Sequence, residues 1–253
     1  MDPVAAGGFA AASPTYARIR PTYARGAVGL VKESCRRGGH VVDVAAGTGI
    51  LTGQLSRAGL RVTAVEPLTP MVRHLRRALP AVPAVRATAE SLPFAPSSAD
   101  ALTVGQAFHW FSSDAALAEA SRVLRPDGLL ALLWNVRDQS IPWVGELTEL
   151  VEARSGGRPY SDHREHDWAD VVARSGHFGD VHVDRFANPV ATTVAGVIDR
   201  VRSTSFVAVM AEPDREALLG EVADLLAGHR ELRGTFEYPH DTVVLRCRPS
   251  GDA

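Results

Sequence analysis

The chain has 253 residues, and its 27 Lys and Arg against 29 Asp and Glu give a formal net charge of −2. Hydrophobic residues make up 45% and charged residues 22%, which excludes disorder, collagen and a coiled coil as descriptions of the whole chain. A charge so close to neutral gives no electrostatic reason to bind nucleic acid or an anionic membrane, so neither is expected as a partner.

The cysteine and targeting signals indicate the cytoplasm. Cys35 and Cys247 are far apart and form no Cys-x-x-Cys pair, so we expect two buried thiols in a reducing compartment. The first residues lack the basic and leucine-rich regions of a secretory signal. The longest apolar run, Gly128 to Trp134, is far shorter than a membrane span.

Strand and helix patterns alternate from residue 38 to residue 137, after a helical stretch over 13–36 that Pro21 interrupts. Short apolar runs predict buried strands over 40–46, 61–66, 84–88, 101–107 and 129–136. Helical spacing predicts helices over 50–58, 70–79 and 113–124. Thr69 and either Ser112 or Ser113 are the expected N-caps, and Pro126-Asp127-Gly128 is the expected turn. This alternation predicts a parallel sheet with helices on both faces.

The pattern changes after residue 137. Helices are expected over 142–154, 167–175, 194–203 and 213–227, and strands over 181–186 and 242–247. The last strands suggest a hairpin-like edge on the parallel sheet. Since no linker rich in Pro, Gly or Ser interrupts the chain, we expect a single domain over 1–253. Its expected parts are an N-terminal segment over 1–37, a core over 38–137, and a helical cap with the C-terminal strands over 138–253.

A glycine-rich turn carries the chemistry. Gly47 and Gly49 lie between the first strand and the first helix, where a bare backbone can approach a ligand and the helix N-terminus offers free amides. Glu66 ends the second strand directly before Pro67, in position to accept two hydrogen bonds from ribose hydroxyls. These residues predict a half-sheet that binds a nucleoside.

The spacing also indicates which nucleoside. A dinucleotide site follows Gly-x-Gly-x-x-Gly, but Thr52 occupies the third glycine position here. The Asp43 carboxylate precedes the turn, where it would repel a pyrophosphate. It suits a ligand that carries an ammonium group, as S-adenosylmethionine does. That ligand is therefore favoured over a nicotinamide dinucleotide, and a nicotinamide oxidoreductase is disfavoured.

The motifs resemble a known family. Val42 to Gly49 resembles motif I of class I S-adenosylmethionine-dependent methyltransferases, and Val65-Glu66-Pro67 resembles their ribose-binding acidic motif. Ala89 to Phe94 resembles the Ala-Glu-x-Leu-Pro-Phe segment of the UbiE-like (methyltransferase type 11) branch, which borders adenine. Further matching segments are Gly105 to Phe111, Arg125 to Leu129, and the opening Tyr16-x-x-x-Arg20-Pro21-x-Tyr23, which resembles a lid over the pocket.

The resemblance implies a Rossmann-like α/β fold: a mostly parallel seven-stranded sheet with an antiparallel C-terminal strand, helices on both faces, an N-terminal lid and a helical cap. It implies S-adenosylmethionine as the cofactor and methyl transfer to an oxygen, carbon or nitrogen atom of a small-molecule metabolite. We expect a bacterial, cytoplasmic enzyme that is a monomer or a homodimer. The same fold used as a non-methylating cyclase or isomerase that retains the cofactor is the alternative.

The resemblance also implies the cofactor-binding residues. They are Tyr16, Arg20, Asp43, Ala45, Gly47, Thr48, Gly49, Glu66, Pro67, Leu68, Met71, Thr88, Ala89, Glu90, Gln106 and Ala107. Two of them depart from the family's pattern. Ala45 stands where motif I often has glycine, and Thr88 stands where many relatives carry an Asp near the adenine amino group. For Arg20 the alternatives are pairing with a carboxylate of cofactor or acceptor, and a surface position.

His109 is the candidate catalytic residue. It lies just past the fourth predicted strand, at the crevice where this architecture binds ligands, and an imidazole titrates near neutrality. It either takes a proton from the acceptor or, with Trp110, only shapes the pocket, since alignment alone can drive methyl transfer.

A metal site is one interpretation of the run from Asp162 to Asp167, and a solvated loop with a helix cap is the other. The run holds His163 and His166, three residues apart. The spacing supplies no complete set of ligands, so no metal is expected.

Overall fold

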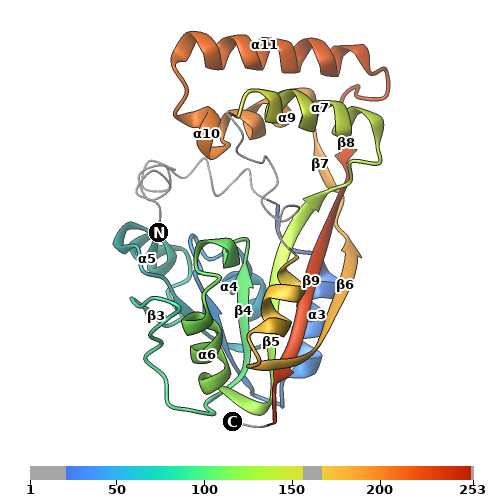
Figure 1. Cartoon of the computed structure of the whole chain (residues 1–253). Coiled ribbons are helices and arrows are strands. Elements are labelled where there is room, and N and C mark those ends of the chain that lie inside the picture. The colour runs from blue at the N-terminus through green and yellow to red at the C-terminus, as the bar shows by residue number, and fades with distance from the viewer. Residues whose placement is uncertain (1–20, 156–166, 252–253) are drawn as a thin grey trace. The chain divides into compact units, whose positions relative to one another are not determined.

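The computed structural model describes residues 21–155 and 167–251 (Figure 1). Two compact units divide these residues. The sheet unit contains residues 22–135, 167–186 and 242–251, and the helical unit contains residues 21, 136–155 and 187–241. The single domain and the internal boundaries expected from the sequence stay predictions.

The sheet unit is built on a seven-stranded sheet with the order β3-β2-β1-β4-β5-β9-β6. Strands β1 to β5 pair in parallel, and β9 is the antiparallel strand (Figure 1). The strands are β1 (His40–Val44), β2 (Arg61–Val65), β3 (Ala84–Val85), β4 (Ala99–Gly105), β5 (Leu124–Arg137), β6 (Phe178–Ala187) and β9 (His240–Pro249). This arrangement confirms the predicted fold class.

The strand order places the switch point of the sheet between β1 and β4. From β1 the chain moves outward to β2 and β3 on one side, and then returns to β4 and β5 on the other. Val44 pairs with both Val65 and Val104, so the carboxyl ends of β1, β2 and β4 lie at one edge. Ligands bind in the crevice at this edge of such sheets.

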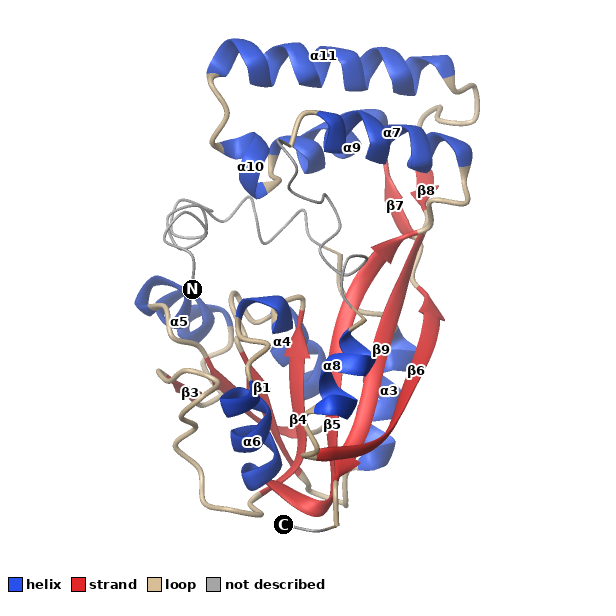
Figure 2. Ribbon diagram, in the orientation of Figure 1, coloured by secondary structure: helices blue, strands red, loops and turns tan. Residues whose placement is uncertain are grey.

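Helices cover both faces of the sheet (Figure 2). On one face, α3 and α4 share a core with alternate residues of β5, namely Leu129, Ala131 and Leu133. The helices of this unit are α3 (Arg25–Ser34), α4 (Ile50–Arg57), α5 (Thr69–Ala78), α6 (Asp114–Val123) and α8 (Trp168–Arg174), with the 3-10 turn η1 (Phe108–Trp110). Strand β1 is buried along its whole length, because both faces are covered.

The helical unit has a core of its own. Its elements are α7 (Pro142–Ala153), α9 (Val194–Arg202), α10 (Ser205–Ala208), α11 (Glu212–Gly228) and the antiparallel pair β7 (Val190–Thr192) and β8 (Phe236–Tyr238). Trp143, Leu147, Val201, Leu218 and Tyr238 are among its buried residues. Within the described ranges, no helix of either unit has the length and apolar character that crossing a membrane requires.

Most predicted elements are confirmed, and the differences have physical causes. Ser113 caps α6, since its hydroxyl accepts the Ala116 N–H at 3.2 Å. The prediction that Thr69 caps the preceding helix, α5, is wrong: that helix begins at Thr69 itself, after Leu68, which offers no capping side chain. The Pro126-Asp127-Gly128 turn lies inside β5, where Ala99 pairs with Leu124 but Ala101 pairs with Leu129. The extra residues bulge out of the ladder. The sequence analysis missed β7, β8, α10 and η1, all four residues or shorter.

A polar chain anchors the start of α3 to the middle of the sheet. The Ala24 N–H donates to the Thr242 hydroxyl at 2.8 Å, and that hydroxyl donates to Asn135 Oδ1 at 2.6 Å. Asn135 Nδ2 donates to the Thr22 carbonyl at 3.1 Å, and Gln106 Nε2 donates to the Asn135 carbonyl at 3.2 Å. Two strands, β5 and β9, thereby hold the chain that leads into α3, and Gln106, directly after β4, bonds to the Asn135 backbone.

Replacing Thr242 with Val tests this anchor. Thr and Val side chains have similar shapes, but the variant removes the hydroxyl that bonds both to the buried Ala24 N–H and to Asn135 Oδ1. We expect a loss of about 1–3 kcal/mol in the free energy of unfolding, measured by urea denaturation. Thr148→Val is the matched control, because the equally buried Thr148 hydroxyl bonds only to the carbonyl of Val144 in its own helix. Equal losses in the two variants would contradict the anchoring role.

Candidate functional site

The glycine-rich turn leaves β1 with a run of left-handed residues. Ala45, Gly47 and Gly49 have φ angles of 54°, 56° and 87°, a region that L side chains seldom adopt. A Cβ on Gly49 would lie 3.0 Å from Leu79 and 3.3 Å from Leu75. A Cβ on Gly47 would meet no atom of the described residues within 4 Å. Gly49 therefore allows close packing against α5, whereas Gly47 faces a space that no described residue fills.

Glu66 holds two turns at once. One carboxylate oxygen accepts the Gly47 N–H and the other accepts the Leu68 N–H, both at 2.9 Å. The residue is only 5% exposed. Burial raises the pKa of Glu66 above its usual range, and the bonds from Leu68 and Gly47 act in the opposite direction. Each oxygen keeps a further lone pair, so the carboxylate can still accept hydrogen bonds from a ligand.

Asp43 lies beneath the turn. It is 1% exposed, and its two oxygens accept hydroxyl hydrogen bonds from Thr52 at 2.5 Å and from Thr103 at 2.9 Å. Burial raises the pKa of Asp43 to about 6, against the lowering effect of these bonds. The carboxylate thus ties α4 and β4 to β1.

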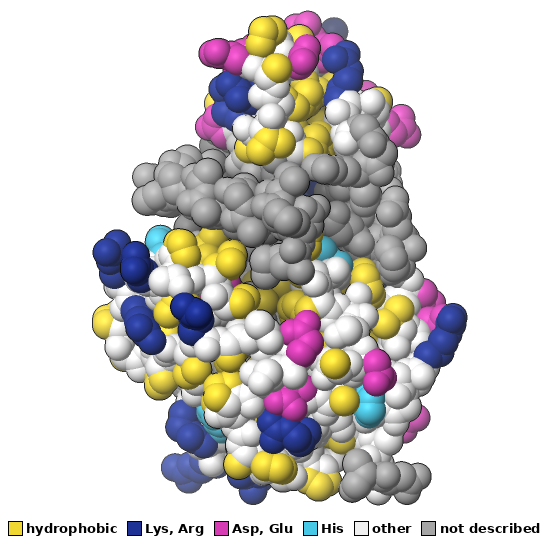
Figure 3. All heavy atoms as spheres, turned by 60° about the vertical axis from the view of Figure 1, so that its left-hand side comes forward, with side chains coloured by type: hydrophobic (Ala, Val, Ile, Leu, Met, Phe, Trp, Pro, Cys, Tyr) yellow, Lys and Arg dark blue, Asp and Glu magenta, His cyan; other side chains and the backbone are white. Residues whose placement is uncertain are grey.

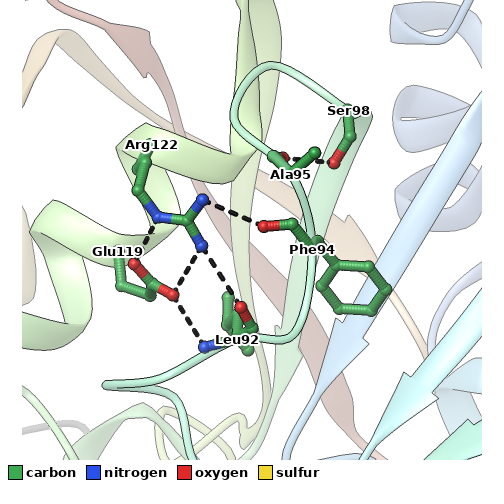
Figure 4. A network of polar contacts seen from close by, with 6 residues as sticks. All are labelled: Leu92, Phe94, Ala95, Ser98, Glu119 and Arg122. Atoms are coloured by element: carbon green, nitrogen blue, oxygen red, sulfur yellow. Dashed lines mark hydrogen bonds and ion pairs between the residues drawn. The ribbon is translucent and has the colours of Figure 1, made fainter.

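The segment after β3 is clamped by α6 (Figure 4). Arg122 donates to the carbonyls of Leu92 and Phe94 at 3.2 and 2.9 Å, while Glu119 accepts the Leu92 N–H at 2.7 Å. Arg122 and Glu119 also pair in a fork, at 2.6 and 2.7 Å. Such two-bond pairs are directional and strong. The pair fixes the backbone of the segment that begins with Thr88, Ala89 and Glu90.

Tyr23 closes onto the carboxyl end of β4. A Cβ at Gly105 would collide with the Tyr23 hydroxyl and lie 3.0 Å from its ring carbon Cζ. The Tyr23 backbone exchanges two 2.8 Å hydrogen bonds with the Gln54 side chain. Gly105 is therefore required for close approach of an aromatic ring from the N-terminal part of the chain.

His109 follows directly on this end of β4. Gln106 adopts a φ of 57° while its N–H donates to the Leu133 carbonyl at 2.8 Å. This turn leads into η1, which carries His109 with the Trp110 ring 4.7 Å away. His109 is half-buried.

The structure brings most of the predicted residues to one edge of the sheet. The turn after β1, Glu66 after β2 and Gln106 with Ala107 after β4 all follow strand ends that pair in register. Glu90 and Thr88 are exposed, and Ala89 and Met71 are buried. Tyr16, Arg20 and the run from Asp162 to His166 lie outside the described residues.

Other contributing residues escaped the sequence analysis. Thr52 and Thr103 bond to Asp43, Arg122 and Glu119 clamp the segment after β3, and Asn135 bonds to Gln106. The i,i+3 spacing of Glu119 and Arg122 indicates an ion pair. Its carbonyl partners lie 28 and 30 residues away in the chain, and no local pattern names them.

Comparisons with known proteins agree on one class. A family described as a methyltransferase domain matches residues 42–132. A relative from Mycobacterium tuberculosis, named an uncharacterised methyltransferase, is 36% identical over 242 residues, 94% of each chain. A solved structure from Anaeromyxobacter dehalogenans, described as a type II methyltransferase, has a TM-score of 0.66 at 24% identity and covers 91% of this chain and 96% of its own. Phosphoethanolamine N-methyltransferase 2 of Haemonchus contortus was solved with S-adenosylhomocysteine. Its TM-score is 0.50 at 16% identity, and the match covers 88% of this chain and 52% of that one.

Replacing Gly47 with Ala tests the open space over the turn. We expect S-adenosylhomocysteine to bind at least about tenfold more weakly by calorimetry, because the new methyl group would enter the space over the turn where the sequence predicts the ligand. The left-handed backbone should cost about 1–2 kcal/mol of unfolding free energy. Gly59→Ala is the matched control, with φ at 88° and open space around its Cβ among the described residues. It should lose similar stability and no affinity. Unchanged affinity in Gly47→Ala would contradict this placement.

Asp43→Asn tests the buried carboxylate. Because the folded-state pKa of about 6 lies above the ordinary 3.8, folding favours the protonated form, and this stabilisation is lost as pH rises through 6. The variant carries no charge to bury. Its stability relative to the wild type should therefore rise between pH 4 and pH 8, by roughly 2–4 kcal/mol, as measured by urea denaturation at each pH. A difference that stays constant or falls with pH would refute the assignment.

Proposed function

This chain belongs to the class I S-adenosylmethionine-dependent methyltransferases, and on that basis we propose that it methylates an oxygen, carbon or nitrogen atom of a small molecule. The observation that carries the proposal is the pairing of an open glycine turn with a buried carboxylate, Gly47 with Glu66, at the switch point of the sheet. The helical unit has a core of its own, and we propose that its residues contribute to recognition of the acceptor.

The residues at this edge fit the cofactor, which is S-adenosylmethionine. Gly47 leaves room above the backbone, and Glu66 keeps lone pairs for the ribose hydroxyls. The segment from Thr88 to Glu90 would border adenine, and Gln106 with Ala107 would contact the methionine portion. Asp43 is engaged with two threonines, so we assign it a positioning role through the turn.

The remaining residues predicted to bind the cofactor belong to the same proposal. Those in the described part of the chain are Ala45, Thr48, Gly49, Pro67, Leu68 and Met71. Tyr16 and Arg20 remain lid candidates.

Methyl transfer requires mainly that the protein align the acceptor atom with the methyl group. S-adenosylmethionine, when bound, would supply a methyl group on a positively charged sulfonium, whose leaving group is a neutral thioether. The acceptor atom forms the new bond to carbon and gives up its proton. We propose that the His109 imidazole takes that proton, since it lies in η1 immediately beyond β4. The chain's other contribution is to hold the acceptor in line.

A macromolecular acceptor has one observation in its favour. Exposed arginines gather on α5 and after β3, at Arg73, Arg76, Arg77 and Arg86, and Figure 3 shows Lys and Arg side chains collected on this face. Against it, the whole chain has a net charge of −2. Solvent exposure is sufficient to explain these arginines. The other alternative, a cyclase or isomerase that retains the cofactor, is not supported by the methyltransferase relatives.

His109→Gln tests both the reaction and the base. With the purified chain, release of S-adenosylhomocysteine is measured against phenols, amines, carbon acids and total RNA. We expect turnover with a small molecule and none with RNA. For a hydroxyl or carbon-acid acceptor, the variant should lose about 10²–10⁴ in kcat, with unchanged affinity for S-adenosylhomocysteine. His182→Gln, on an exposed position of β6, should behave as the wild type. An unchanged kcat in His109→Gln would leave the histidine a shaping role only, and methylation of RNA alone would refute the small-molecule acceptor.

A further inference from the structure

The turn that carries His109 has one side chain in the core of the sheet unit. η1 is a single 3-10 turn whose two backbone hydrogen bonds are local, with the Ala107 and Phe108 carbonyls as acceptors at 3.0 Å. Turns of this kind are short and have poor hydrogen-bond geometry. Phe108 is 2% exposed, whereas His109 and Trp110 are half-buried. The buried Phe108 ring is therefore the contact between this turn and the core.

Two aromatic side chains meet the Phe108 ring edge to face. The Phe111 ring lies 5.9 Å away with an interplanar angle of 84°, and the Trp168 ring of α8 lies 5.4 Å away at 81°. Aromatic pairs prefer these separations and this arrangement. The contact with Phe111 is local, because that residue directly follows η1. Trp168 is thus the partner that links the turn to another element of the sheet unit.

Trp168 is itself held from two sides. It is 7% exposed, and its indole stacks on that of Trp134 in β5, with centroids 6.4 Å apart and planes 8° apart. Asp167, directly before it, caps α8 by accepting the Asp170 N–H at 3.2 Å. A row of three rings, Phe108, Trp168 and Trp134, therefore joins η1 to β5 through α8. All three rings belong to the sheet unit.

The position of the turn matters because His109 is the proposed base. A general base works only within hydrogen-bond distance of the proton that it takes, and a displacement of about 1 Å can lower a rate by about 10². We propose that Trp168 is a positioning residue for His109: through Phe108 it holds η1 so that the imidazole stays within reach of the acceptor. The inference rests on the proposed function, because that function gives His109 its role.

The family match covers the base but not its support. His109 and Phe108 lie within residues 42–132, the range that matches the methyltransferase domain, whereas Trp134 and Trp168 both follow it. The positioning role of Trp168 is therefore a property of this chain's own α8, beyond what membership of the family implies.

The Hε1 resonance of His109 tests this contact without any turnover. It is assigned by its loss in His109→Gln and recorded on the full chain. We expect the resonance to shift and broaden in Trp168→Leu, which keeps an apolar side chain but removes the ring that meets Phe108. Trp168→Phe restores a ring and should return the resonance close to its wild-type position.

Val172→Ala is the matched control for lost packing. Val172 is fully buried one turn further along α8, so its truncation should lower stability and leave the His109 resonance in place. If Trp168→Leu does not fold, Phe108→Leu removes the same contact from the other side. A resonance that stays unchanged when the contact is removed, or that moves equally in Val172→Ala, would overturn the proposal.

Kinetics then separate the positioning role from the proposed function. With a hydroxyl or carbon-acid acceptor, Trp168→Leu should lower kcat at least about tenfold, while KM and the affinity for S-adenosylhomocysteine stay within about twofold of the wild type. Because Trp168 acts through His109, the same change made in His109→Gln should lower kcat less than about twofold further.

The two proposals fail in different ways. The same fold loss from Trp168→Leu in both backgrounds would refute the positioning role and leave His109 as the base of a methyltransferase. A His109 resonance that depends on Trp168, in a protein that methylates no small molecule, would keep the structural contact and refute the proposed function.

Discussion

The carboxylate of Glu66 is the constraint on which the candidate site depends. Its two oxygens accept the Gly47 and Leu68 N–H groups, so one side chain at the end of β2 holds the turn after β1 and the turn before α5. Without it, the backbone N–H groups of two half-buried turns would each need another partner. The same group keeps lone pairs toward a ligand, which allows binding to use a geometry that folding has already set.

A second layer of polar contacts supports this edge from below and from the sides. Asp43 ties α4 and β4 to β1 through two threonine hydroxyls, and Arg122 with Glu119 clamps the segment after β3. Most of these groups are removed from water, so each has to be satisfied inside the protein. The raised pKa of Asp43 shows the cost of burying such a charge. Burial of these polar groups thus lowers the stability of the sheet unit, while their hydrogen bonds fix the backbone of the loops.

The helical unit contrasts with this pattern. Its core is apolar and aromatic, with the Arg200 guanidinium over the Tyr238 ring, and burial lowers the pKa of His240 to about 3. The sheet edge of the other unit presents backbone amides and a carboxylate suited to a nucleoside.

The sequence by itself determined the parallel sheet, the glycine turn and the acidic residue after β2, because these depend on local periodicity and on neighbouring positions in the chain. It predicted Ser113 as a cap for the same reason. It misassigned Thr69 and missed the two-stranded pair β7 and β8, since such short elements form only where their partners lie. Only the tertiary structure decided which side chains support the site. Thr103 meets Asp43 across 60 residues, Thr242 meets Asn135 across 107, and Arg200 meets Tyr238 through packing. Contacts of that range depend on how strands and helices assemble, which no local pattern records.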